Sequence, residues 1–381
     1  MTVTIPPPPS SGSASPFTPG FGTQPPTLVG RQAEVDAFAR AIDGGPGARG
    51  RATLVTGQRG VGKTVLLGTF REVASTRQWI TVQEQASPGF AQRLARARLP
   101  EVLEAFDAAT TSKAKMIGLT LPAGLGGVSW RDEKDHMGIP DIRTTLMTLL
   151  GLLEERGTGL LITLDEVHRS TIDELRVVTD AMAHAIGEGA PLAFVAAGLP
   201  HSINGLVNDE VSTYLRRAER VELGYFDRES SAHAIRTPIE EAGKTIDEDA
   251  LALATDRSEY YPYLVQLLGD LAWEAAGAAS AIAVEHVEAA VGQAREIMGR
   301  QIHEPTLDPL SARDLDYLRA MALDDGPSRT VEIARRMSVT DKYASTYRRR
   351  LVDAGVVVPA GHGLVDLAVP YLREHLRVRS R

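Results

Sequence analysis

The segment from Gly57 to Thr64, with the sequence GQRGVGKT, has the residue types and the spacing of a loop that binds phosphate groups. Its glycines let the backbone approach a ligand closely, so that successive N–H groups can point at the β- and γ-phosphates of a nucleotide. Lys63 would bridge these phosphates, and the Thr64 hydroxyl would bind Mg²⁺. The residues expected to hold the phosphates are Gly57, Gln58, Arg59, Gly60, Val61, Gly62, Lys63, Thr64 and Val65. The alternative, a glycine-rich turn with an incidental Lys-Thr pair, is disfavoured by the strand and the helix that flank the segment.

Two carboxylates, Asp165 and Glu166, follow the apolar segment Leu160–Leu164. A buried strand has no structural use for two acidic residues at its end, so their position points to chemistry. Asp165 would hold Mg²⁺ through water, and Glu166 would polarise the water that attacks the γ-phosphate. The alternative is the start of a helix with an acidic N-cap. The phosphate-binding pattern upstream favours the first interpretation, which predicts hydrolysis of ATP to ADP and phosphate.

Alternating apolar and helical patterns predict the elements that position these groups. Strands are expected at Ala52–Thr56, Trp79–Gln83, Gly159–Leu164 and Leu192–Ala197, and helices at Lys63–Ser75, Ala91–Ala108, Ile142–Arg156 and Asp173–Ile186. Strands this uniformly apolar, alternating with helices, indicate a parallel sheet that is covered on both faces. The predicted fold class is therefore α/β, with the parallel sheet of a P-loop NTPase. An insertion at about 87–141 contains the segment Lys115–Trp130, which we interpret as a hairpin or a partly ordered loop.

The remaining regions differ from this core in composition. Residues 1–26 carry no charge and contain eight of the 22 prolines, which predicts a disordered tail. The P-loop core is expected over 27–226, and a continuously helical pattern predicts a helical lid domain over 227–308. A third module is expected over 309–381.

This third module has the layout of a winged helix-turn-helix, with three helices followed by a hairpin. The helices are expected at Ser311–Leu323, Thr330–Met337 and Thr340–Gly355, and two short strands within Val356–Ala368. The polar positions of the third helix would enter a DNA major groove: Lys342, Tyr343, Ser345, Thr346, Arg348, Arg349 and Arg350. His362 would lie at the tip of the wing. The alternative is that this module closes the lid or joins subunits instead of contacting DNA.

Charge and composition limit the classes of function. The chain has 41 Lys and Arg against 49 Asp and Glu, a net charge of −8, whereas residues 309–381 have thirteen against nine, a balance of +4. With no cysteine, the chain has no disulfide, thiolate zinc site or cysteine nucleophile. The sequence contains no apolar run near the roughly 18 residues that span a membrane, so we expect a cytoplasmic protein without a membrane partner.

Five segments in a fixed order resemble those of the AAA+ and STAND-type ATPases. They are LVGR from Leu28, GQRGVGKT, the LDE strand end, FVAAGLP at Phe194–Pro200 and LRRAERVELGYF at Leu215–Phe226. The chain is most similar to the origin-recognition-like branch of bacterial and archaeal ATP-binding proteins with a C-terminal winged helix. The resemblance implies ATP and Mg²⁺ as cofactors and a homo-oligomer as the assembly.

The resemblance also assigns residues outside the phosphate loop. Val29, Gly30 and Arg31 would line the adenine pocket, and Pro262 would pack near the adenine. Arg217 would reach the γ-phosphate of a neighbouring subunit as a catalytic arginine, with Arg216 and Arg220 as alternatives in register. The alternative is that these arginines are solvent-exposed charges at the end of a helix and have no catalytic role.

Two departures from the family pattern put fast hydrolysis in doubt more than nucleotide binding. The family has a polar residue that senses the γ-phosphate where this chain has Ala197, Gly198 and Leu199, and Ser202 and Asn204 are the nearest candidates. The family's Gly-x-Pro signature in the lid is replaced by Tyr260-Tyr261-Pro262.

The sequence thus predicts a nucleotide-dependent molecular switch that associates with double-stranded DNA through Lys342, Arg348, Arg349 and Arg350. The alternative is a signalling or scaffold ATPase whose winged helix contacts an unknown protein partner. A small-molecule kinase is disfavoured, because such an enzyme needs no winged helix.

Overall fold

The computed structural model describes residues 14–20, 29–105, 142–168, 171–208 and 215–379. They divide into two compact units. We call residues 34–56 and 67–221 the sheet unit, and residues 1–33, 57–66 and 222–381 the helical unit, each as far as the structure describes it. The predicted hairpin at 115–130 lies outside the described residues. Within the described part of the chain, no helix is long and apolar enough to cross a membrane.

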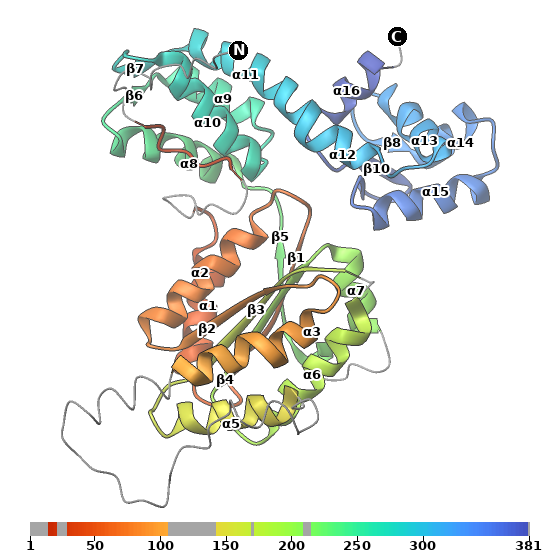
Figure 1. Ribbon diagram of the computed structural model, residues 1–381. Helices are drawn as coiled ribbons and strands as arrows, with labels where there is room; N and C mark the ends of the chain where they lie inside the picture. The colour runs from red at the N-terminus through yellow and green to blue at the C-terminus, as the bar shows by residue number, and fades with distance from the viewer. Residues whose placement is uncertain (1–13, 21–28, 106–141, 169–170, 209–214, 380–381) are drawn as a thin grey trace, which may run out of the picture. The chain divides into compact units, whose positions relative to one another are not determined.

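A five-stranded sheet forms the centre of the sheet unit (Figure 1). Its strands, in the order β2-β3-β4-β1-β5, are β2 (Ile80–Gln85), β3 (Leu160–Val167), β4 (Leu192–Gly198), β1 (Ala52–Gly57) and β5 (Glu219–Leu223). Strands β1 to β4 pair in parallel, which confirms the predicted sheet. The sequence did not predict β5, because this edge strand alternates half-buried and exposed positions and has one buried residue at its end, instead of being uniformly apolar.

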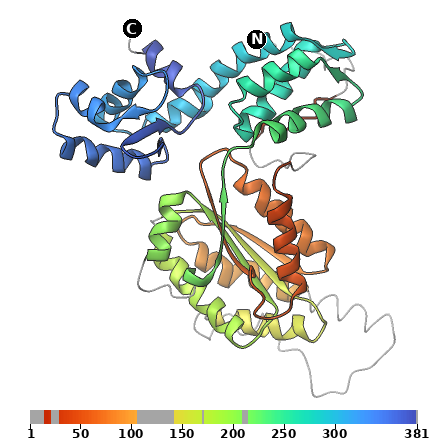
Figure 2. The same ribbon diagram turned by 180° about the vertical axis from the view of Figure 1, so that it is seen from behind.

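Helices cover both faces of the sheet (Figures 1 and 2). On one face, α3 (Phe90–Arg93), α5 (Ile142–Glu154) and α6 (Ile172–Gly187) pack on the side chains of alternate strand residues such as Leu54, Ile162 and Phe194. The other face is covered by α1 (Gln32–Asp43) and α2 (Lys63–Thr76), whose Phe38 and Phe70 rings stack at 4.2 Å. The predicted helix at 91–108 contains a π-helical turn, Leu94–Arg98, and is described to residue 105. Helix α7 (Pro200–Asn208) follows β4.

The helical unit contains the helices expected after Asp227. They are α8 (Arg228–Glu241), α9 (Glu248–Arg257), α10 (Pro262–Ala276) and α11 (Val284–Met298), and a short parallel pair, β6 (Thr245–Ile246) and β7 (Ala281–Ile282), joins their loops. Helix α10 is the centre of this bundle, because Leu264, Val265 and Leu268 are completely buried.

Residues 14–20, which the sequence assigns to a disordered tail, pack against this bundle. Phe17 is only 4% exposed, and a Cβ atom at Gly269 of α10 would lie 2.4 Å from its ring. The Thr18 N–H group donates to the Gln266 side chain at 3.2 Å. The prediction is therefore wrong for these residues, because one large apolar side chain can find a partner that a proline-rich composition does not reveal.

The C-terminal module has more elements than the sequence predicted. Helices α13 (Ala312–Ala322), α14 (Thr330–Arg336) and α15 (Asp341–Asp353) are followed by strands β9 (Val357–Pro359) and β10 (Leu364–Leu367). Ser311 and Thr340 cap α13 and α15 as expected. The unpredicted elements are the two-residue strand β8 (Ser328–Arg329), which pairs with β10, and helix α16 (Leu372–Arg379). The segments η4 (Gly299–His303) and α12 (Glu304–Leu307) lead into the module.

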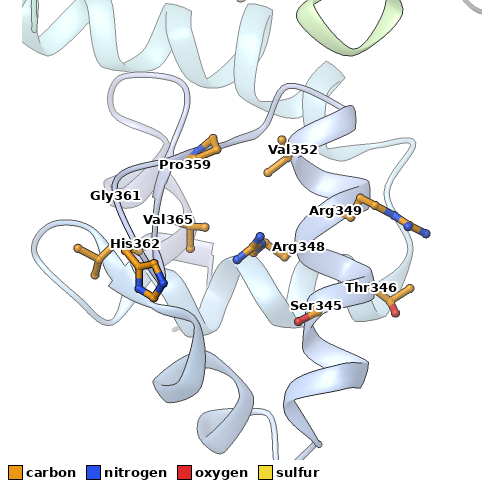
Figure 3. Close-up of a pocket in the computed structure, with 11 residues that line it drawn as sticks. Ser345, Thr346, Arg348, Arg349, Val352, Pro359, Gly361, His362 and Val365 are labelled. Carbon is orange, nitrogen blue, oxygen red and sulfur yellow. The ribbon is translucent and has the colours of Figure 1, made fainter. Parts of the chain in front are cut away.

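A cavity of about 720 Å³ lies between α15 and the β9–β10 turn, which we call the wing (Figure 3). Arg348 and Arg349 of α15 line it, together with His362 of the wing and Leu364 of β10. The Arg348 side chain points from α15 toward the wing. The cavity is therefore bordered by the two elements that the sequence associated with a DNA surface.

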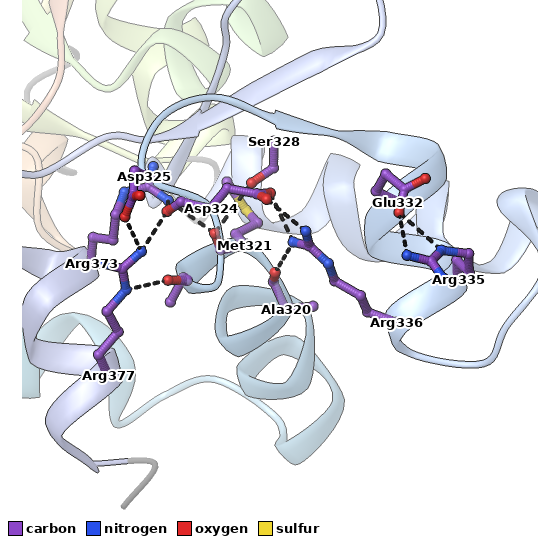
Figure 4. Close-up of polar contacts among 11 residues, drawn as sticks. Ala320, Met321, Asp324, Asp325, Ser328, Glu332, Arg335, Arg336, Arg373 and Arg377 are labelled. Carbon is purple, nitrogen blue, oxygen red and sulfur yellow. Dashed lines mark hydrogen bonds and ion pairs between the residues drawn. The ribbon is translucent and has the colours of Figure 1, made fainter.

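Arginine side chains close the C-terminal end of α13 (Figure 4). Arg336 donates to the two carboxylate oxygens of Asp324 at 2.6 and 2.8 Å and to the carbonyl oxygen of Ala320 at 2.7 Å. Arg373 and Arg377 of α16 donate to the carbonyl oxygens of Met321, Ala322 and Asp324. These cations satisfy carbonyl groups that have no partner within the helix.

The Asp324–Arg336 contact gives a testable effect on stability. Hydrogen bonds from Arg336 lower the pKa of Asp324 to about 2 from an ordinary value of 3.8. Because the folded pKa is depressed, the stabilisation is present above pH 3.8 and is lost as the pH falls through 2. Asp324→Asn should lower the free energy of unfolding by about 1–2 kcal/mol at pH 7, a value discounted for partial exposure. Urea denaturation between pH 7 and pH 2 measures this difference, with Asp308→Asn as the exposed control, and a difference independent of pH would contradict the assignment.

Candidate functional site

The predicted phosphate loop lies between β1 and α2, and its conformation requires glycine at two positions. Gly60 has a φ of 72° and Gly62 a φ of 95°, a region of backbone conformation that other residues adopt rarely. A Cβ atom at Gly62 would meet no atom within 4 Å, so this peptide borders open space that a ligand can enter. The loop therefore fits a phosphate group, because its backbone is both exposed and turned as close approach requires.

Lys63 begins α2 and folds back over the loop. Its Nζ atom donates to the carbonyl oxygens of Gly57 at 2.9 Å and Gln58 at 2.7 Å. A Cβ atom at Gly57 would lie 2.6 Å from the Leu223 carbonyl oxygen, so the start of the loop tolerates only glycine. Thr64 is exposed, and Val61 is buried beneath the loop. This arrangement keeps a positive charge at the loop's centre.

The two carboxylates lie at the carboxyl end of β3, where the strand is irregular. The pairing of β3 with β4 shifts register between Leu164 and Val167, and Glu166 has a φ of 55°. The Glu166 N–H group donates to the Asp165 side chain at 2.8 Å, and the Gln85 amide donates to the Glu166 carboxylate. Asp165 is half-buried, whereas Glu166 is exposed. The β-bulge thus directs two successive acidic residues into different surroundings, as two different roles require.

Strand register within the sheet unit aligns the carboxyl ends of β1 and β3. Thr56, the residue before the loop, pairs with Gly198 of β4, and Val167, the residue after Glu166, pairs with the same Gly198. The carboxyl ends of parallel strands meet at one edge, which is where ligands bind in sheets of this kind.

Arg71 of α2 is a charged residue of this region that sequence reasoning missed. Its guanidinium donates to the Thr163 hydroxyl at 3.3 Å. Burial lowers the pKa of Arg71, while the negative charges of Asp165 and Glu72 act in the opposite direction. The spacing along the helix could have identified it, because Arg71 follows Thr64 by two helical turns and therefore lies on the same face of α2.

The other predicted residues are placed as follows. Val29 is buried, Gly30 has a φ of 68°, and the Arg31 guanidinium lies 5.3 Å from the centre of the Phe226 ring and donates to the Gly224 carbonyl oxygen. Pro262 starts α10, and the N–H group of the next residue, Tyr263, donates to the Gly60 carbonyl oxygen at 3.2 Å. The structure therefore brings the start of α10 to the phosphate loop.

The predicted sensor residues and the predicted catalytic arginine lie on the segments that follow β4. Ser202 is buried with its hydroxyl 3.3 Å from the His201 ring, and the side chain of Asn204 lies outside the described part of the chain. Arg217 ends the short 3₁₀ segment Leu215–Arg217 and is exposed, as are Arg216 and Arg220. Exposure is compatible with contact to a neighbouring subunit, and the assignment of Arg217 as a catalytic arginine stays a prediction.

Comparison with known proteins supports the P-loop identification. The AAA ATPase domain family matches residues 27–195, and a domain of unknown function matches residues 300–376. No curated protein matches the chain.

Two solved structures show the same fold over nearly the whole chain. The Walker-type ATPase PabY2304 of Pyrococcus abyssi has a TM-score of 0.62 at 18% identity, and covers 93% of this chain and 97% of its own. The ADP form of the Aeropyrum pernix ORC2 protein has a TM-score of 0.55 at 15% identity, and covers 95% of this chain and 96% of its own. Residues 27–195 therefore match the AAA ATPase domain family, and the chain has the P-loop NTPase fold.

Proposed function

We propose that the protein binds ATP with Mg²⁺ and acts as a nucleotide-dependent molecular switch. The observation that carries this proposal is the loop Gly57–Thr64, with its two left-handed glycines and its central lysine, inside a segment that matches the AAA ATPase domain. The exposed loop backbone and Lys63 would hold the phosphates, while Val29, Gly30, Arg31 and Pro262 would hold the adenine. ATP-binding titrations with Lys63 and Glu166 variants, argued in the Discussion, test this proposal.

The two carboxylates at the end of β3 support slow hydrolysis of ATP to ADP and phosphate. Thr64 and Asp165 would hold Mg²⁺, which when bound neutralises charge on the phosphates. Glu166 would accept a proton from the water that attacks the γ-phosphorus, and the bond to the β-phosphate oxygen breaks as ADP leaves. The Gln85 amide, which donates to the Glu166 carboxylate, would hold that base in one orientation. Arg217 of a neighbouring copy would stabilise the charge that develops, which makes turnover dependent on assembly.

We further propose that the C-terminal module is a winged helix-turn-helix that binds double-stranded DNA. The support is that some cations of the module form ion pairs with carboxylates and others do not. Eight arginines form ion pairs with carboxylates: Arg313, Arg319, Arg335, Arg336, Arg350, Arg373, Arg377 and Arg379. Among the described residues of the module, four cations form no ion pair: Arg329, Lys342, Arg348 and Arg349.

These four cations lie around one surface. Lys342, Arg348 and Arg349 belong to α15, and Arg348 and Arg349 line the cavity beside the wing (Figure 3). Arg329 of β8 pairs with Leu364 of β10, which lines the same cavity. Cross-strand partners project to the same face of a sheet, so Arg329 adds a cation that the sequence did not single out. Exposed cations without carboxylate partners are the ones that can neutralise phosphates.

Arg350, in contrast, stabilises the folded module through an ion pair with a buried carboxylate. Its guanidinium donates at 2.9 Å to Asp314, whose side chain is 1% exposed, and lies 5.7 Å from the centre of the Tyr347 ring. Removing this partner would leave a buried carboxylate with less compensation, which costs about 1–3 kcal/mol. We therefore correct the expectation for Arg350 and assign this residue to stability instead of to DNA.

The DNA proposal predicts a change in salt dependence. Arg348→Ala together with Arg349→Ala should make the slope of log K against log salt shallower by about two units, because each neutralised phosphate contributes about −0.9. A fluorescent duplex titrated at several salt concentrations, with ATP and with ADP, measures the slope. Arg313→Ala together with Arg319→Ala removes the same two charges from exposed ion pairs on α13 and should leave the slope nearly unchanged.

Wild-type protein that binds no duplex in either nucleotide state, even at low salt, would contradict the DNA proposal. The signalling or scaffold ATPase with a protein partner would then take its place.

A further inference from the structure

Tyr261 of the helical unit contacts the phosphate loop directly. Its hydroxyl donates to the Arg59 carbonyl oxygen at 2.9 Å, and its side chain is completely buried. A Cβ atom at Gly60 would lie 2.0 Å from the Tyr261 hydroxyl oxygen. Gly60 is therefore needed both for its backbone conformation and to leave room for this tyrosine. Together with the Tyr263 N–H bond to the Gly60 carbonyl oxygen, this contact fixes both peptide carbonyls at the tip of the loop.

Tyr225 continues this contact toward the C-terminal module. Its ring centre lies 5.2 Å from that of Tyr261, at an angle of 49°. Its hydroxyl donates to the carbonyl oxygen of Ala368, the residue after β10. The residues that follow Tyr225 and precede Tyr261 are also hydrogen-bonded, because the Phe226 N–H group donates to the Tyr260 carbonyl oxygen at 2.9 Å. The path therefore consists of a hydrogen bond, a ring contact and a second hydrogen bond, all inside one compact unit.

Ala368 is joined to the strands that border the cavity in the module. It is 4% exposed, and its N–H group donates to the Val356 carbonyl oxygen at 2.9 Å, directly before β9. Strand β10, which ends at the preceding residue, contributes Leu364 and Val365 to the cavity lining. A displacement of Ala368 would thus reach the wing through backbone bonds.

We propose that Tyr261 and Tyr225 are positioning residues that connect the phosphate loop to the wing, so that nucleotide binding changes the wing. The nucleotide part of this inference rests on the proposed function. A phosphate that binds the loop draws its N–H groups inward and rotates the Arg59–Gly60 peptide, whose carbonyl group is the one that Tyr261 holds. The ring contact passes the shift of Tyr261 to Tyr225, and the Tyr225 hydroxyl passes it to Ala368. Tyr261 is completely buried, so close packing limits how its ring can move without moving its neighbours. Tyr225 is 38% exposed, so its step of the path depends on the ring contact and on its hydrogen bond to Ala368.

Hydrogen exchange of the full-length protein tests the connection first without nucleotide. Tyr261→Phe keeps the ring and removes only the hydroxyl, which contacts the loop and not the module. Exchange of the amides in residues 356–368 should accelerate about fivefold, the factor that corresponds to roughly 1 kcal/mol for one hydrogen bond. The matched control is Tyr263→Phe on the same helix, whose hydroxyl donates to the Gln301 side chain instead and which should leave these amides unchanged. Unchanged exchange in Tyr261→Phe, at wild-type thermal stability, overturns the connection.

A second arm adds ATP or ADP to wild type and to Tyr225→Phe. In wild type, the two nucleotides should give different exchange rates in residues 356–368, and Tyr225→Phe should remove this difference while keeping wild-type nucleotide affinity. A difference that persists in Tyr225→Phe overturns the path through this residue. A failure of wild type to bind either nucleotide overturns the proposed function, whereas the Tyr261→Phe result in nucleotide-free protein still decides the connection. The two failures are therefore distinguishable.

Discussion

Lys63→Ala is expected to weaken ATP binding about 100-fold or more while leaving the fold intact. Lys63 is the lysine of the phosphate loop, and its ammonium group is held at the loop's centre by the Gly57 and Gln58 carbonyl oxygens. A hydrogen bond to a charged group contributes roughly 1.5–3 kcal/mol, and this lysine would make such bonds to two phosphates. The fold should survive, because those two carbonyl groups belong to a loop that water reaches on its open side.

Titration with a fluorescent ATP analogue measures the affinity, and thermal denaturation checks the fold. Lys342→Ala is the matched control, since it removes the same charge from an exposed position on α15. It should leave ATP affinity at the wild-type value. An unchanged affinity in Lys63→Ala would show that the loop does not hold the phosphates.

Glu166→Gln is expected to keep ATP binding and to lower turnover by a factor of about 10² to 10⁴. The amide is nearly the same size as the carboxylate but cannot accept the proton of the attacking water, and general-base catalysis contributes a factor of this size. Gln85 donates to this side chain, so the amide oxygen at position 166 can still accept that bond and keep the local structure. Phosphate release under saturating ATP measures turnover, and the analogue titration measures binding.

Two further variants distinguish the loss of the base from the loss of the group that orients it. Glu188→Gln changes an exposed carboxylate at the end of α6 and should not affect turnover. Gln85→Ala leaves the base in place but removes the group that orients it, so turnover should fall less than in Glu166→Gln. If Glu166→Gln turns over ATP near the wild-type rate, the base is a different residue.

Features that depend on local pattern were predictable from the amino-acid sequence. Uniformly apolar strands, the Gly57–Thr64 loop between a strand and a helix, and the caps Ser311 and Thr340 are all encoded within a few residues of one another. Each was located correctly, because the spacing that identifies it is also the spacing that forms it. Strand β5 was missed for the same reason, since its alternating pattern carries no signal of a buried parallel strand.

Contacts between groups that are distant in the sequence became visible in the folded structure. Tyr261 is 202 residues from Arg59, and Arg350 is 36 residues from Asp314, so no local pattern reveals that the first pair touches the phosphate loop or that the second stabilises the module. In the sequence, Arg348, Arg349 and Arg350 are three equal cations on one helix. Packing makes them different, because successive residues of a helix point about 100° apart and only one of the three finds a buried carboxylate. The role of a charged side chain follows from the partner that folding brings to it, and that partner is set by long-range contacts.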